Sequence, residues 1–169
     1  TPVPSSAASD VYKRQGTTWS ELNDLNLGRA NGGGLGTVDA ALYMGGQPTI
    51  SCTEEWNGTS WSEVTNMTTA RANNQGVGTQ NAGLIFGGNP GIATTEEYNG
   101  TSFSAGGSLI TAIFGAGGAG IQNAALKFGG STPSVSNTTE HYNGTSWTAG
   151  GNLITSRTYL KGAGTENSA

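Results

Sequence analysis

The chain has 169 residues, of which 29 are glycine and 11 % are charged, and its net charge is −4 at pH 7. Basic clusters typical of proteins that bind nucleic acid or anionic membranes are missing from the sequence, and no apolar stretch approaches the ~20 residues of a transmembrane helix. Collagen would need glycine at every third position, and disorder would need many charges and few aromatic residues. The composition therefore favours a repeat protein.

The first residues do not resemble the rest of the sequence. The stretch "SSAASDVYKRQ", Ser5–Gln15, lacks the apolar core that a secretory signal needs. Written as codons, the stretch resembles a common transposase-based sequencing adapter over its whole length. We therefore interpret residues 1–15 as an artefactual, disordered leader. We expect the native sequence, a metagenomic fragment, to begin near Gly16.

Three short motifs recur after this leader. "GTTW" at Gly16–Trp19 returns as "GTSW", "GTSF" and "GTSW" at intervals of 42, 42 and 44 residues. A Gly-Gly pair closes an apolar stretch in "LYMGG", "LIFGG" and "LKFGG", and "TEEWNG" returns as "TEEYNG" and "TEHYNG". Self-similarity at a fixed period of this size is the signature of a repeat architecture.

Each repeat is predicted to contain four short strands. In the middle copy these are about Asn73–Thr79, Ala82–Gly87, Thr94–Tyr98 and Thr101–Ala105. Asn-Gly between the third and fourth strands predicts a two-residue type I′ turn, because both of its positions need positive φ. The first strand has few bulky side chains, as expected of a strand that its neighbours crowd around a central axis. Four-stranded units of this length are typical of propeller blades.

These markers resemble the Kelch repeat, in which an apolar strand ends in Gly-Gly and is followed by an aromatic residue, a tryptophan and often an arginine. Here they are Gly45-Gly46, Trp56, Trp61 and Arg71 in the first full unit, and Ile113 stands where an arginine is expected to open the third. The resemblance implies an all-β fold, an incomplete β-propeller of three full blades with single strands of a preceding and a following blade.

We accordingly expect a Kelch-like β-propeller fragment over residues 16–169, with blades at about 29–67, 71–109 and 113–153. Both ends are interpreted as truncations. Open blade edges carry unpaired backbone groups, so self-association through these edges is expected.

The sequence predicts no catalytic, cofactor or metal site. Adjacent residues of a strand point to opposite faces, so the pairs Glu54-Glu55 and Glu96-Glu97 cannot converge for acid–base catalysis. The chain has one histidine, His141, and one cysteine, whereas a zinc or copper site needs several such ligands. We expect a protein that is not an enzyme and holds no cofactor.

Binding is expected on the loops that differ between the units. The connections between second and third strands, "QPTIS", "NPGIA" and "STPSVSN", share a face of an up-and-down blade with the connections from one blade to the next. The candidate ligand-facing residues are Gln47, Thr49, Asn89, Ser131, Thr132, Ser134, Arg29, Arg71 and Arg157. For the arginines, which recur at the starts of the blades, a second interpretation is favoured over contact with a ligand: they hydrogen-bond carbonyl groups of neighbouring blades or loops.

A non-enzymatic binding or structural module is the favoured function. "NGTSW", "TAR" and "GTQNA" resemble Kelch-like repeats of uncharacterised marine viral and bacterial proteins, some of them regarded as tail-fibre or virion components. This resemblance implies a virion or extracellular location. The Asn, Thr and Ser side chains of the variable loops indicate a protein or glycan ligand, and the acidic net charge without basic clusters argues against nucleic acid or a membrane as partner. Two alternatives stay open: the non-catalytic segment of a secreted propeller enzyme similar to galactose oxidase, and a protein-interaction adaptor.

Overall fold

Most strands belong to three successive antiparallel sheets, which we call the first, second and third sheets. The computed structural model describes residues 11–15 and 17–168, and this part of the chain is all β, without a helix. Each of the three sheets has four strands that follow one another in sequence order. Alternating short strands and glycine-containing turns favour this meander, because consecutive antiparallel strands need only short connections.

The strand bounds follow the repeat. The first sheet comprises β3 (Gly33–Gly36), β4 (Ala41–Met44), β5 (Thr53–Trp56) and β6 (Trp61–Glu63). The second comprises β7 (Gln75–Thr79), β8 (Ala82–Phe86), β9 (Thr95–Tyr98) and β10 (Phe103–Ala105). The third comprises β11 (Gly117–Ile121), β12 (Ala124–Phe128), β15 (Thr139–Tyr142) and β16 (Trp147–Ala149). Two short hairpins complete the fold: β1 (Val11–Gln15) with β2 (Thr18–Leu22), and β13 (Ser131–Thr132) with β14 (Ser134–Val135).

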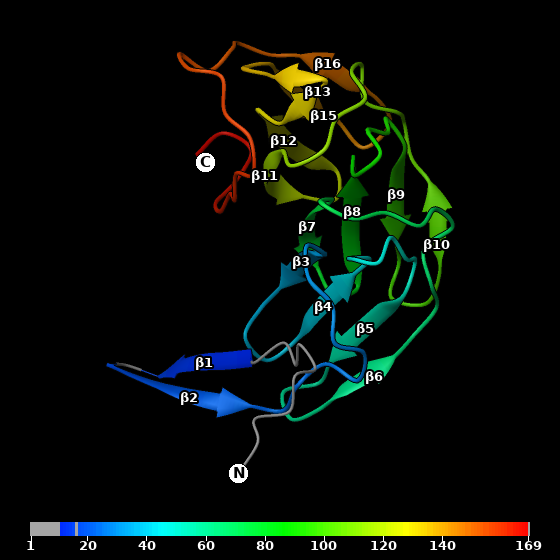
Figure 1. Ribbon diagram of the computed structural model, residues 1–169, viewed down its shortest axis with the longest axis vertical. Coiled ribbons are helices and arrows are strands. Elements are labelled where there is room, and N and C mark those ends of the chain that lie inside the picture. Colours follow the sequence, from blue (N-terminus) through cyan, green and yellow to red (C-terminus); the bar gives the residue numbers. More distant parts are fainter. Residues whose placement is uncertain (1–10, 16, 169) are drawn as a thin grey trace.

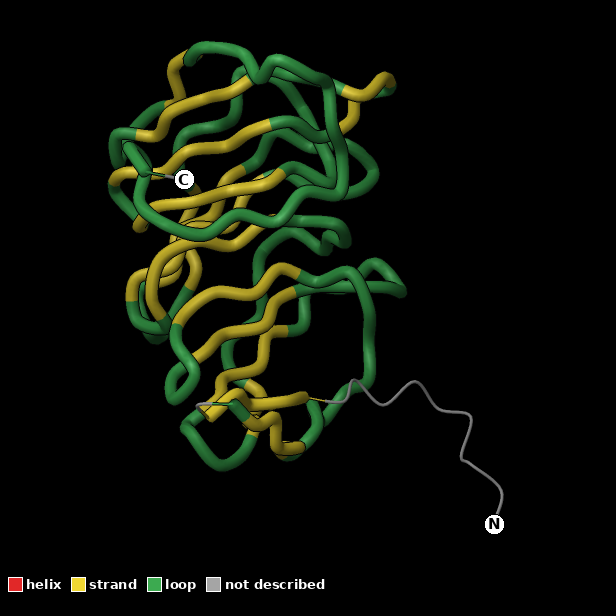
Figure 2. Tube along the Cα trace, turned by 90° about the vertical axis from the view of Figure 1, so that its left-hand side faces the viewer, coloured by secondary structure: helices red, strands yellow, loops and turns green. Residues whose placement is uncertain are grey.

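The three sheets stand side by side along an arc (Figure 1). Their first strands β3, β7 and β11 lie on the inner side of the arc, where β7 contacts both β3 and β11. The fourth strands β6, β10 and β16 lie on the outer side. Figure 2 shows the sheets from another side, with loops at both ends of the strands. The predicted all-β class and the three four-stranded units are confirmed, and their arrangement is consistent with a propeller-like one.

The inner strands are crowded, as their composition predicted. A Cβ atom on Gly118 of β11 would lie 2.7 Å from both the Phe86 ring and the Gln75 side chain of the second sheet. Real Cβ atoms do not approach other atoms so closely, so glycine allows the inner strands of adjacent sheets to pack together.

Backbone hydrogen bonds join the starts of the inner strands. Four residues at equivalent positions of successive units have φ angles between 53° and 62°: Asn31, Asn73, Gly115 and Tyr159. The amide of Asn73 donates to the carbonyl of Asn31 (2.6 Å), Gly115 to Asn73 (2.9 Å) and Tyr159 to Gly115 (2.7 Å). Each unit is thereby tied to the next on the inner side of the arc.

Side chains from the third and fourth strands fill the space between sheets. The Trp147 ring of the third sheet packs edge-on against Phe86 of the second, with 5.0 Å between ring centroids, and its Nε1 donates to Thr95 Oγ1 over 3.0 Å. Tyr142 crosses the same interface and donates its hydroxyl proton to Glu97 Oε1 over 2.6 Å. Burial, followed by this hydrogen bond to a carboxylate, raises the pKa of Tyr142 to about 12.

The hairpin between the third and fourth strands differs from the predicted two-residue turn. Trp56 pairs directly with Trp61, so the loop contains the four residues 57–60. Gly58 has a φ of 92°, whereas Asn57 is not among the residues with positive φ. Its side-chain Oδ1 instead accepts the amides of Thr59 and Ser60, both at 2.9 Å. Asparagine is favoured here because its side chain caps the turn, rather than because it adopts positive φ.

The ends of the chain also differ from expectation. Within the leader expected to be disordered, residues 1–10 lie outside the described residues, but Val11–Gln15 form β1 and pair with β2. Arg14 lies opposite Trp19 as Trp56 lies opposite Trp61, so β1 takes the place of a third strand. Valine and tyrosine favour an extended backbone. The hydrogen bonds between paired strands join backbone groups, so this segment can pair with β2 whatever its side chains are. The hairpin therefore supplies two strands of a preceding unit, where one was predicted.

The expected strand of a following unit does not form. Residues 157–168 contain only an isolated bridge between Thr165 and Ser168. The segment nevertheless lies along β11, because Gly120 donates its amide to the carbonyl of Gly164 over 3.0 Å. In each full sheet the first strand pairs with a second strand, and the described residues provide no such partner for this segment.

Candidate functional site

The candidate site is the surface formed by two sets of connections, which we call the loop face. The first set links second to third strands, at residues 45–52, 87–94 and 129–138, and the second set links one unit to the next, at residues 23–32, 64–74, 106–116 and 150–158. Bridges between Ala30 and Gln47, Ala72 and Asn89, and Phe114 and Ser131 join the two sets in every unit. The expectation that both sets share a face is therefore confirmed.

The residues predicted to face a ligand are not equally accessible. Four of them are exposed: Gln47, Thr49, Ser134 and Arg157. Two are half-buried, Asn89 and Thr132, and three are buried, namely Ser131, Arg29 and Arg71. Ser131 donates its hydroxyl proton to the carbonyl of Pro133 over 3.2 Å. The side chains open to a ligand thus come mainly from the loops between second and third strands.

Arg71 is enclosed in the second sheet, which corrects its assignment as a ligand-facing residue. Its guanidinium donates to the carbonyls of Gly87 (3.1 Å) and Thr94 (2.9 Å), in agreement with the second interpretation of the arginines. It also lies 2.5 Å from Glu96 Oε1, an ion pair that the sequence did not predict. Burial lowers the pKa of Arg71, and the charge of Glu96 acts in the opposite direction.

Glu96 also holds a loop of the preceding connection. It accepts the amides of Thr68 (2.7 Å) and Thr69 (3.2 Å), as well as the Thr68 hydroxyl (2.7 Å). Glu96 is 1 % exposed and its neighbour Glu97 is half-buried on the other side of the strand, so the two carboxylates diverge as predicted. The Glu96 carboxylate therefore anchors the loop face to the sheet.

The first sheet repeats this arrangement. Arg29 is buried beside Glu54, to which it is hydrogen-bonded, and its Nε donates to the carbonyl of Gly45 over 2.8 Å. The ring of Tyr43 lies beneath its guanidinium, 4.9 Å from Cζ to the ring centroid. Glu54 accepts the amide of Asn26 over 2.7 Å. Arg29, like Arg71, is therefore an internal residue and not a ligand-facing one.

The third sheet keeps the carboxylate but takes its cation from another strand. Ile113 stands at the position of Arg71 and is fully buried, while Lys127 of β12 lies 3.3 Å from Glu140. Glu140 accepts the amide of Ile110 over 2.8 Å. Burial lowers the pKa of Lys127, and the adjacent carboxylate counteracts this shift. Two features of the sequence indicated that a lysine replaces the arginine here: Lys127 lies within the apolar strand "AALKF", and Ile113 stands where the arginine is expected.

A small polar hollow lies where the loop face meets the inner side of the arc. It has a volume of about 150 Å³ and is lined in part by Asn31, Asn73, Asn74 and Lys161. The Oδ1 atom of Asn74 is buried and has no hydrogen-bond partner among the described residues. Amide groups and an ammonium offer donors and acceptors for the hydroxyl groups of a polar ligand.

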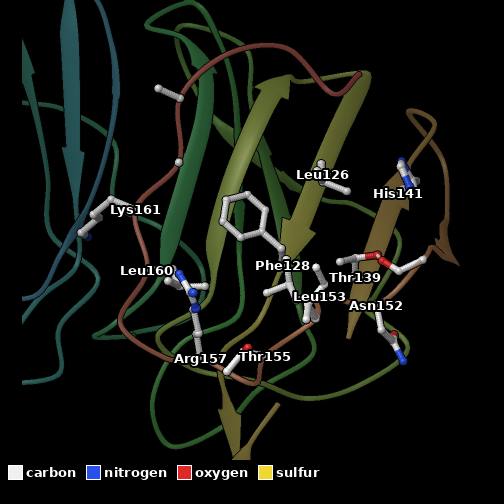
Figure 3. Close-up of a pocket in the computed structure, with 14 residues that line it drawn as sticks. Leu126, Phe128, Thr139, His141, Asn152, Leu153, Thr155, Arg157, Leu160 and Lys161 are labelled. Carbon is white, nitrogen blue, oxygen red and sulfur yellow. Dashed lines mark hydrogen bonds between the residues drawn. The ribbon is translucent and has the colours of Figure 1, made fainter. Parts of the chain in front are cut away.

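A larger pocket of about 780 Å³ lies on the face of the third sheet that is turned away from the second (Figure 3). Leu126 and Phe128 of β12 line one part of it, and Leu160 of the C-terminal segment lies across from them. Arg157, predicted to face a ligand, also lines this pocket, and His141 lies near its rim with its Nδ1 2.8 Å from Glu166 Oε1.

In the part of the chain that the structure describes, no group of three or more His, Cys, Asp or Glu residues is placed to hold a metal ion. No helix of membrane-spanning length and hydropathy occurs in that part either. Comparison of the sequence with protein-family models and with curated proteins finds no match to either.

Proposed function

We propose that the chain is a non-enzymatic recognition module, a Kelch-like segment of an incomplete β-propeller that binds its ligand on the loop face. The observation that carries this proposal is the contrast between the buried ion pairs of the sheets and the exposed loops of the loop face. The buried cation and carboxylate recur in all three sheets, whereas the exposed loops above them differ in sequence and length. Variable loops on a rigid scaffold are the usual arrangement of a binding surface.

A glycan is the ligand class that this surface favours. Its exposed side chains include the amide of Gln47 and the hydroxyls of Thr49 and Ser134, and the adjacent hollow adds the amides of Asn31 and Asn73. Such neutral groups both donate and accept hydrogen bonds, as sugar hydroxyls require. The resemblance of the repeats to Kelch-like repeats of marine viral and bacterial proteins, some of them regarded as virion components, supports an extracellular or virion setting.

Binding to a panel of immobilised oligosaccharides tests this function. We expect the full chain to bind at least one member, and a variant with Gly-Ser sequences of equal length at residues 47–50, 89–93 and 131–137 to lose most of that binding. A less invasive variant, Gln47→Ala combined with Thr49→Ala and Ser134→Ala, should weaken binding roughly tenfold or more, since several hydrogen bonds of about 0.5–1.5 kcal/mol each are removed.

The matched control replaces residues 37–40, a turn at the opposite ends of the strands, with a Gly-Ser sequence. This control should bind as the unaltered chain does, and the circular dichroism of all variants should keep its β signature. Undiminished binding by the loop-face variants, or no binding to any sugar, would contradict the proposed function.

A further inference from the structure

The lining of the large pocket of the third sheet contains no tryptophan, whereas Trp147 covers the same face of the second sheet; Phe128 is half-buried in the pocket and Thr139 is 6 % exposed. Phe128 and Thr139 in the pocket occupy the positions of Phe86 and Thr95, each pair lying on the second and third strands of its sheet. Phe86 and Thr95 are 1 % and 2 % exposed, because Trp147 of the next sheet covers both. The internal interface thus shows which side chain this surface accepts: a tryptophan from a fourth strand.

The other end of the molecule presents such a tryptophan. Trp19 of β2 has the register of Trp147, since it lies opposite Arg14 as Trp147 lies opposite Tyr142. Trp19 is 65 % exposed, whereas Trp147 is 5 % exposed. The β1–β2 hairpin therefore carries an aromatic side chain in position for a preceding sheet.

We propose that a second copy of this chain docks head to tail on the third sheet, with its β1–β2 hairpin against the pocket. Trp19 of that copy then packs on Phe128, and its Nε1 donates to Thr139 Oγ1, as Trp147 does toward Phe86 and Thr95. Thr139 donates its own proton to the carbonyl of Gly151 over 2.7 Å, which leaves its oxygen free to accept.

The C-terminal segment takes the place of a first strand beside this hairpin. The amides of Tyr159 and Gly120 tie the segment to β11 on the inner side of the arc, in the place of a first strand. The hairpin has the register of third and fourth strands, which lie toward the outer side. The segment also touches the face that the hairpin would cover: Glu166 Oε1 lies 2.8 Å from His141 Nδ1 on β15, and a Cβ atom on Gly162 would lie 2.8 Å from the Phe128 ring. The docked hairpin therefore shares this face with the segment, as Trp147 shares the Phe86 face of the second sheet with Gly118 of β11.

A head-to-tail contact uses two different surfaces, so it forms dimers and then larger rings or filaments. Sedimentation velocity over a range of concentrations should show this growth for the full chain. Trp19→Ala should weaken the association roughly tenfold or more, since buried aromatic anchors dominate interfaces. The control Val135→Ala removes another exposed apolar side chain, on the loop face, and should associate like the unaltered chain.

Mixing two variants, each with one of the two surfaces disrupted, tests whether the contact is head to tail. Trp19→Ala blocks one surface and Phe128→Glu blocks the other, so each variant alone should sediment as a monomer. Their mixture retains one intact Trp19 and one intact pocket, and should form a dimer and nothing larger. A monomeric unaltered chain, undiminished association of either variant, or a mixture that stays monomeric would overturn the proposal.

Discussion

Replacing Arg71 with isoleucine is expected to lower the free energy of unfolding by about 3–5 kcal/mol. The substitution leaves the carboxylate of Glu96 buried without its cation, although the amides of Thr68 and Thr69 still donate to it. Removing one partner of a buried ion pair costs much more than an exposed pair contributes, because the remaining charge has lost its hydration. Urea unfolding followed by tryptophan fluorescence measures the change.

The third sheet provides the compensating substitution. It combines Ile113 with Lys127, and Ile85 of the second sheet lies opposite Glu96 as Lys127 lies opposite Glu140. Adding Ile85→Lys to Arg71→Ile should therefore restore most of the lost stability, whereas Ile85→Lys alone should destabilise. A double variant no more stable than Arg71→Ile would contradict the equivalence of the two arrangements.

Arg157→Ile is the matched control for these variants. Arg157 has the same position in the repeat but is exposed, so its replacement should change the free energy of unfolding by no more than about 0.5 kcal/mol. A loss comparable to that of Arg71→Ile would show that the buried carboxylate is not the cause.

Replacing Trp147 with alanine should also lower the free energy of unfolding by about 3–5 kcal/mol, because it empties the space between the second and third sheets. The ring covers Phe86 and its Nε1 satisfies Thr95. Trp147→Phe should cost less, because Phe103 fills the same position in the second sheet and packs against the core of the first. Thermal unfolding followed by circular dichroism distinguishes the two variants.

Trp19 supplies the control for the loss of a tryptophan as such. It has the same place in the repeat as Trp147 but is 65 % exposed, so Trp19→Ala should leave the unfolding of the monomer almost unchanged. Equal losses for the two alanine variants would contradict the role of Trp147 in joining the sheets.

Features set by neighbouring residues were predictable from the sequence. Gly45-Gly46 and its equivalents marked the ends of the second strands, and β7, β8 and β9 lie within about a residue or two of their predicted bounds. The Asn57-Gly58 hairpin was placed correctly, but its type was wrong, because the side chain of Asn57 offered a second way to satisfy the turn.

Features set by contacts between distant residues were not predictable in the same way. Arg71 and Glu96 are far apart in the sequence, so an arginine at the start of a unit could be placed equally well inside the sheet or on its surface. The strand β1 was missed because the composition of its segment says nothing about backbone pairing with β2. The exposed loop residues were found from their variation between the units.

Native-state hydrogen exchange tests most directly whether buried carboxylates hold the loop face. One loop amide in each unit donates to a buried carboxylate: Asn26 to Glu54, Thr68 to Glu96 and Ile110 to Glu140. Two turn amides serve as the comparison, because Thr59 and Ser60 donate to the exposed side chain of Asn57. The first three should exchange orders of magnitude more slowly, because their release requires the sheet to open. Equally fast exchange of both groups would contradict the anchoring of these loops in the sheets.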